Sequence, residues 1–155
     1  MPRDDIEDDN YGVYTPMMEA MGESTALHKD ERVSEAVKNG FTEKCYDGQP
    51  FFSERHQVGS ITYSNKGDAK LDAESFQAAR QSIMSLKNEK GQPLNIVPNV
   101  LLVPPALEKE ARMILEAELV NGTSNINKGL AEVVVWSQLA DKPTQWYLLC
   151  TKRSL

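Results

Sequence analysis

The chain has 155 residues, of which 40% are hydrophobic and 26% charged, a balance typical of a globular protein with one core. Its formal net charge of −6 and pI near 5.0 argue against function through electrostatic attraction to nucleic acid or to an anionic membrane. The sequence predicts no membrane span and no signal peptide. Its two cysteines, Cys45 and Cys150, are expected to be reduced thiols.

Residues 1–12 form an acidic lead-in, and residues 13–40 have the pattern of a long helix. Thr15 and Pro16 suit the start of that helix, Asn39-Gly40 suits its end, and a break is expected near Gly22–Asp30. Three methionines lie on its apolar side, which is typical of adaptable core packing and also of a groove for a partner. They are Met17, Met18 and Met21.

Residues 41–72 are predicted to be an irregular loop region. Short strands are expected at Gln49–Phe52 and Gly59–Tyr63, and turns at Tyr46–Gly48 and Asn65–Asp68. An irregular segment of this length is typical of a functional or mobile loop.

Residues 73–155 are predicted to be a helix-and-sheet core. Asp72 can cap a helix at Ala73–Glu89, and Val100–Val103 suits a strand that is buried on both faces. Pro104-Pro105 ends that strand and starts a helix through Leu119, which Asn121-Gly122 would close with a left-handed cap.

Two further strands are expected near the end of the printed sequence, at Leu130–Trp136 and Gln145–Cys150. They are predicted to pair with each other as antiparallel neighbours joined by a loop. The fold class is therefore α+β, with helices packed on a sheet that contains antiparallel pairing.

The search for chemistry gives only weak candidates. Cys45, Asp47 and His56 are the residue types of a cysteine nucleophile with its base, but their spacing matches no local signature. Cys45 with His28 and His56 lacks the spacing of a zinc site. The early acids lack the layout of a calcium loop; they are Asp4, Asp5, Glu7, Asp8 and Asp9. The sequence therefore predicts no catalytic residue, no metal site and no cofactor.

Four stretches, at 3–22, 40–58, 97–115 and 128–155, together resemble the major head (capsid) subunit of Mu-like bacteriophages and prophages. The most specific segments are CYDGQPFF at 45–52, VPPAL at 103–107 and WYLL at 146–149. The evidence lies in the order of these segments along nearly the whole chain, since none of them is by itself a mechanistic signature.

The resemblance implies a partial Hong Kong-type tailed-phage capsid fold, with residues 1–155 as a single region and 13–40 as a spine-like helix. The helices at Ala73–Glu89 and Ala106–Leu119 would flank the sheet that holds Val100–Val103. The N-terminal arm, most of the extended loop and the C-terminal segment of the family would be missing.

The resemblance also implies a shell subunit without catalytic chemistry, located in the virion capsid and, during assembly, in the host bacterial cytoplasm. Its partners would be other copies of itself, with scaffold or head-completion proteins as further candidates, and neither a specific nucleic acid nor a membrane. Two alternatives come from the residues alone. One is a small cytosolic binding or regulatory domain that uses the methionine-bearing helix. The other is an enzyme that uses Cys45 and His56.

Overall fold

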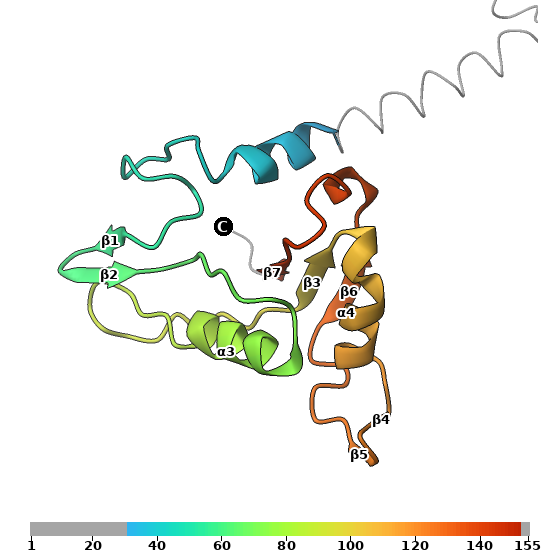
Figure 1. Cartoon of the computed structure of the whole chain (residues 1–155). Helices are drawn as coiled ribbons and strands as arrows, with labels where there is room; N and C mark the ends of the chain where they lie inside the picture. Colours follow the sequence, from blue (N-terminus) through green and yellow to red (C-terminus); the bar gives the residue numbers. More distant parts are fainter. Residues whose placement is uncertain (1–30, 153–155) are drawn as a thin grey trace, which may run out of the picture. The chain divides into compact units, whose positions relative to one another are not determined.

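The computed structural model describes residues 31–152 (Figure 1). Residues 31–39 and residues 40–152 belong to two separate units, and each is described by itself. Residues 31–39 are helical, so the helix ends at Asn39-Gly40, as the sequence predicted. Residues 13–30 of the predicted helix lie outside the described part of the chain. None of the helices in residues 31–152 is long and apolar enough to cross a bilayer.

The second unit contains seven short strands, two α-helices and two 3-10 turns. In chain order these are β1 His56–Val58, β2 Ile61–Tyr63, α3 Ala73–Met84, β3 Val100–Val103, η1 Pro105–Leu107, α4 Glu108–Leu115, β4 Leu119–Val120, β5 Thr123–Ser124, β6 Glu132–Val135, η2 Ser137–Leu139 and β7 Tyr147–Leu149.

The central sheet has three strands in the order β6-β3-β7, with β3 parallel to β6 and antiparallel to β7. Leu101 is thus paired with Val133 on one side and with Leu148 on the other. The predicted strand at 100–103 is confirmed, but the prediction that the two later strands pair with each other is wrong. Strand β3 lies between them because its continuous apolar run suits the buried central position.

The two faces of this sheet carry different packing. Leu101 and Val103 are fully buried on the face that packs against α4 and against Phe76 of α3. Because successive strand residues point to opposite faces, Leu102 and its neighbour Tyr147 belong to the other face, where Tyr147 contacts aromatic rings of residues 41–52. Strand β3 is therefore buried on both faces, as predicted.

Helix α3 begins as predicted and ends earlier. The Asp72 carboxylate accepts the Ser75 N–H at 2.7 Å, and the Ser75 hydroxyl oxygen accepts the Asp72 N–H at 2.9 Å, which completes a capping box. The helix ends at Met84 rather than Glu89. Beyond it, the Asn88 side chain accepts the N–H groups of Lys90 and Gln92, and such local bonds favour a turn over a further helical turn.

The predicted helix through Leu119 is also shorter. It consists of the turn η1 followed by α4, and α4 ends at Leu115. Leu119 is 64% exposed and lies in the small hairpin β4–β5. Asn121 and Gly122 both have positive φ, 51° and 81°, which makes them the two-residue turn of that hairpin rather than a helix cap. The prediction failed because both structures favour the same residues at positive φ.

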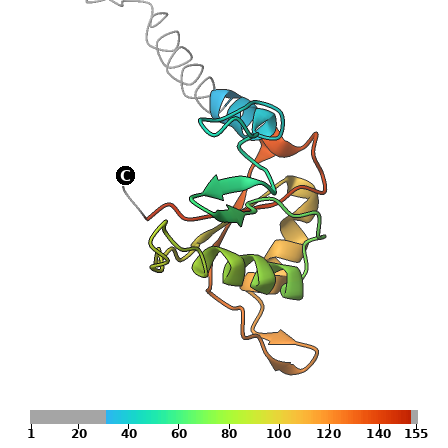
Figure 2. The ribbon, with the colours of Figure 1, turned by 90° about the vertical axis from the view of Figure 1, so that its left-hand side faces the viewer.

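Residues 41–72 contain one antiparallel hairpin, β1–β2, which Figure 2 shows beside α3. The predicted strand at Gln49–Phe52 is reduced to a single bridge between Lys44 and Pro50. The strand expected at Gly59–Tyr63 is present as β2, and its partner β1 was not predicted. The expected turn at Asn65–Asp68 is absent: these residues have no regular secondary structure, and Asn65 bonds back to Ser53.

Candidate functional site

A tight turn at residues 44–50 positions the first two members of a polar cluster. The Cys45 N–H donates to the Gln49 carbonyl at 2.8 Å, and the Gly48 N–H donates to the Cys45 carbonyl at 3.0 Å. Gly48 has φ +77°, a conformation that side chains other than glycine's rarely adopt. The turn predicted at Tyr46–Gly48 is therefore present, and it brings the side chains of Cys45 and Asp47 together.

His56, at the start of β1, completes the cluster. The Cys45 thiol donates to Asp47 Oδ1 at 3.0 Å, and His56 Nδ1 lies 2.5 Å from Asp47 Oδ2. His56 Nε2 lies 3.0 Å from the Phe51 carbonyl, and the Gln49 N–H donates to Asp47 Oδ1 at 3.0 Å. The side chains of Asp47 and His56 are only 13% and 18% exposed. The cluster is thus a half-buried carboxylate between a thiol and an imidazole.

These contacts shift the three pKa values in different directions. The thiol of Cys45 and then His56 lower the pKa of Asp47 to about 2, because both donate to its charged form. The hydrogen bond to Asp47 raises the pKa of His56 above its ordinary value. The same carboxylate, followed by burial, raises the pKa of the Cys45 thiol. These shifts favour the charged forms of Asp47 and His56 and the protonated thiol of Cys45.

This geometry does not support a cysteine nucleophile. A nucleophilic cysteine needs a lowered thiol pKa and a base within hydrogen-bond reach. Here Cys45 donates to a carboxylate, and His56 is bonded to Asp47 and to the Phe51 carbonyl. The alternative metal set included His28, which lies outside the described residues, as do the five early acids.

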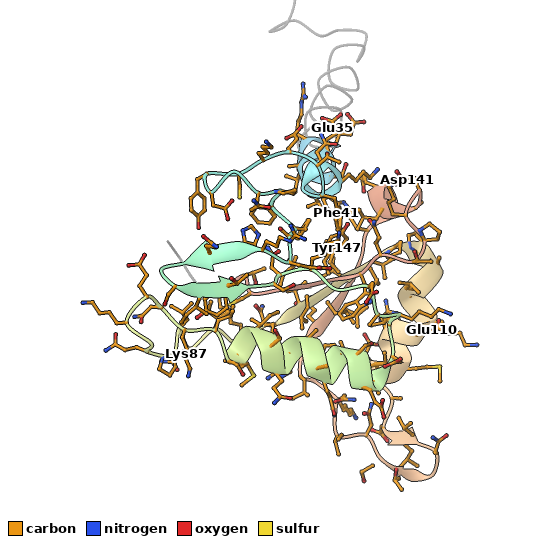
Figure 3. The ribbon with its side chains drawn as sticks, turned by 60° about the vertical axis from the view of Figure 1, so that its left-hand side comes forward. Glu35, Phe41, Lys87, Glu110, Asp141 and Tyr147 are labelled. Carbon is orange, nitrogen blue, oxygen red and sulfur yellow. The ribbon has the colours of Figure 1, made fainter. Side chains whose placement is uncertain are left out.

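An aromatic cluster holds the same loop against the sheet. The rings of Phe41 and Phe52 lie 4.8 Å apart, and both contact Tyr147 of β7, at 6.4 and 5.5 Å between centroids. Figure 3 shows Phe41 and Tyr147 next to each other. Asn65 holds the segment at residues 51–53, since its side chain accepts the Ser53 N–H at 2.8 Å and donates to the Phe51 carbonyl at 2.6 Å. Sequence reasoning missed this role of Asn65.

A wide, open hollow of about 800 Å³ lies between α3, residues 64–69 and β7. Small side chains of α3, including Ala78, Ala79 and Ser82, form part of its wall. Trp146 lines it from β7's side and donates its indole N–H to the Ala69 carbonyl at 3.0 Å. The hollow brings together no constellation of the kind that acyl, phosphoryl or proton transfer requires.

Three exposed apolar side chains lie in the hairpin β4–β5 or near it in the sequence. Leu119 is 64% exposed, Ile126 77% and Met113 of the adjacent helix 55%. Figures 1 and 2 show the hairpin projecting from the rest of the unit beyond α4. Its base is held firmly, because the Asn125 side chain donates to the carbonyls of Ile114 and Ala117, both at 2.9 Å. Side chains of this kind mark a protein contact surface where they form a continuous apolar patch.

Comparison with known sequences gives a consistent result. The family model of the Mu-like prophage major head subunit gpT matches residues 1–70 and 60–139. The major capsid protein of Escherichia phage Mu is 36% identical over 110 residues, which are 71% of this chain and 33% of that protein. The Mu-like prophage FluMu major head subunit of Haemophilus influenzae is 50% identical over 58 residues, 37% of this chain and 19% of that protein. The chain thus spans a third or less of the length of these curated relatives.

Solved structures are similar as well. A structure of the bacteriophage JBD30 capsid superimposes with a TM-score of 0.72 at 23% sequence identity, covering 90% of this chain and 72% of the other. The procapsid of the same phage superimposes with a TM-score of 0.70 at 25% sequence identity, covering 87% of this chain and 71% of the other. The structural similarity therefore extends over most of the chain.

Proposed function

Because the chain belongs to the family of Mu-like prophage major head subunits, we propose that it is a structural subunit of a phage or prophage head shell. The observation that carries the proposal is the TM-score of 0.72 with a phage capsid protein over 90% of the chain. This likeness confirms the predicted α+β class and the partial capsid fold. The proposed role is structural, and it involves no catalysed reaction.

The surface most suited to contacts between subunits is the apolar hairpin. Shell contacts require each subunit to bury complementary area against its neighbours, with no chemistry at the interface. Leu119, Ile126 and Met113 supply exposed apolar area, and the Asn125 bonds keep its shape constant before contact. A surface that is already ordered loses little conformational entropy on binding.

Further parts of the proposal follow from the family. Other copies of the chain are the principal partner, with scaffold and head-completion proteins as additional candidates. The shell subunit would reside in the virion capsid, after assembly in the host bacterial cytoplasm. The formal net charge of −6 is compatible with this role, since an acidic subunit does not cling to packaged DNA.

The test is the mass of the purified chain in solution, by light scattering after gel filtration at several concentrations and salt levels. We expect masses well above the 17.3 kDa of one chain at high concentration, with rings, sheets or shells in negative-stain micrographs. The double variant Leu119→Ser/Ile126→Ser should shift association to higher concentration. Val97→Ser, which also changes an exposed apolar side chain, is the matched control.

A constant mass of 17.3 kDa, together with no incorporation into shells formed by the full-length phage Mu capsid protein, would contradict the proposal. Association that is equally weakened by Val97→Ser would leave the shell role standing but remove the hairpin from the interface. The two results are distinguishable because both variants are compared with the unchanged chain in one concentration series.

A further inference from the structure

The strongest unassigned feature is the cluster of Cys45, Asp47 and His56. One sulfur, one carboxylate oxygen and one ring nitrogen lie within 4.8 Å of one another, and no other group of this kind occurs in residues 31–152. The turn at 44–50 and the start of β1 bring them together. The capsid role makes no use of this arrangement.

Two protons occupy the positions that a cation would take. The thiol proton lies between Cys45 and Asp47 Oδ1, and a ring proton lies between His56 Nδ1 and Asp47 Oδ2. Without these protons, a thiolate, a carboxylate and a nitrogen lone pair would face one another. A divalent cation replaces both protons and balances the two negative charges of the thiolate and carboxylate.

The bonds around the cluster already orient two of the three donors. A carbonyl oxygen only accepts hydrogen bonds, so the contact with Phe51 places a proton on His56 Nε2 and leaves Nδ1 as the coordinating atom. Metal-binding histidines commonly donate their other ring N–H to a carbonyl or carboxylate. The Gln49 N–H likewise holds the Asp47 carboxylate.

We propose that Cys45, Asp47 and His56 bind one Zn²⁺ ion, with water in the fourth position. Sulfur, nitrogen and oxygen donors in one site are the ligands that zinc takes, and a thiolate disfavours magnesium, calcium and manganese. Tetrahedral zinc separates its ligand atoms by about 3.3–3.8 Å, given bond lengths of about 2.0–2.3 Å. The three donor atoms lie within 4.8 Å of one another, so zinc binding would bring the most separated pair closer by about 1–1.5 Å.

The bound ion would link the turn at 44–50 to β1 through three protein ligands. It would stabilise the same loop that Phe41 and Phe52 attach to the sheet. The proposal goes beyond the shell role and does not depend on it, because binding is measured on the single chain at concentrations where it does not associate.

The experiment uses the full chain, reduced and stripped of metal with a chelator that is then removed. Zinc chloride is titrated by competition against a chromophoric chelator, and cobalt chloride is added to a second sample. We expect one zinc ion per chain and, with cobalt, an absorption band from thiolate-to-metal charge transfer. Cys45→Ser, Asp47→Asn and His56→Gln should each weaken zinc binding at least 10- to 100-fold, the range seen even for lost outer-shell partners.

Cys150→Ser is the matched control, since it removes the other thiol and leaves the cluster intact. It should keep both zinc affinity and the cobalt band, whereas Cys45→Ser should lose the band. Far-UV circular dichroism verifies that each variant is folded. The cobalt spectrum of the unchanged chain tests the site without any variant. Absence of the band in the unchanged chain, or its loss in Cys150→Ser, would overturn the proposal.

Discussion

Asn99 and Thr151 bind each other at two points, although 52 positions separate them. The Asn99 side chain donates to the Thr151 hydroxyl at 2.9 Å, and its oxygen accepts the Thr151 N–H at 2.8 Å. The Asn99 N–H also donates to the Leu149 carbonyl at 2.9 Å. The pairing of β3 with β7 thus extends beyond the strands themselves through one asparagine side chain.

We expect Asn99→Ala to lower the free energy of unfolding by about 1 kcal/mol, because two partly exposed hydrogen bonds are lost. Thr151→Ala should cost less, since it removes only the bond to the hydroxyl. Urea denaturation of both single variants and the double variant measures their coupling. Strictly additive losses would show that the two side chains do not stabilise the protein through each other.

Among these predictions, truncation of Phe76 is expected to cause the largest loss of stability. Its side chain is fully buried in the cluster that joins α3, α4 and the sheet. Phe76→Ala should lower the free energy of unfolding by about 3–5 kcal/mol, through lost transfer energy and the cavity left behind. Met113→Ala, at a side chain that is 55% exposed, should change it by less than about 0.5 kcal/mol. Similar losses for both would place Phe76 outside the core.

The Asp47–His56 pair predicts a pH window for stability in the metal-free protein. The pKa of His56 is raised on folding, so its contribution is complete below the unfolded pKa of about 6.5 and is lost as pH rises through the folded pKa. The pKa of Asp47 is lowered to about 2, so its contribution is present above about pH 4 and is lost as pH falls toward 2. The stability difference between the unchanged chain and Asp47→Asn should therefore be greatest between about pH 4 and 6.5.

Urea denaturation across pH, with a chelator present, measures this difference, and an NMR titration of the His56 ring gives its pKa directly. A difference that is independent of pH would show that Asp47 acts through its neutral bonds alone.

Replacing Arg80 is expected to lower the stability of the fold, and lysine at this position is expected to restore little of it. One terminal nitrogen of its guanidinium donates to the carbonyls of Pro98 and Leu130, at 2.9 and 3.2 Å, and so ties α3 to the segments before β3 and β6. Arg80→Met should lower the free energy of unfolding by about 2 kcal/mol, because two half-buried carbonyls lose a charged donor. Arg80→Lys should recover little of this, since the lysine side chain is shorter and its nitrogen does not reach the position of the terminal guanidinium nitrogen.

Thermal unfolding of Arg80→Met and Arg80→Lys beside the unchanged chain tests this prediction. Gln81→Met is the control, because it makes a comparable change at an exposed position of the same helix. Full recovery in the lysine variant would mean that a positive charge at this position, rather than the reach of the guanidinium, holds the two segments.

Local signals predicted the starts of elements better than their ends. The Asp72 cap and the apolar run at 100–103 depend on neighbouring residues alone, and the structure has both where expected. The end of α4 depends on whether the next apolar side chain along the helix packs against the core. Leu119 has the right spacing but remains exposed, and the chain turns into a hairpin instead.

Strand order was beyond the sequence because it depends on long-range competition for one partner. Leu130–Trp136 and Gln145–Cys150 looked like neighbours, yet β3 inserts between them. For the cluster of Cys45, Asp47 and His56, the sequence showed the residue types and that they lie close together along the chain. The central position of Asp47 was not, because it depends on the backbone conformation of Gly48 and on the Phe51 carbonyl that receives His56.

The place of β3 between two later strands has a consequence for the order of events during synthesis. Strand β3 emerges from the ribosome before either neighbour, and at about 5–20 residues per second it waits on the order of seconds for β7. During that interval its apolar side chains lack their neighbours in the sheet, and helices α3 and α4 are the elements that can cover them. Both helices are synthesised before β6 and β7, so β3 can pack against them before the sheet is complete.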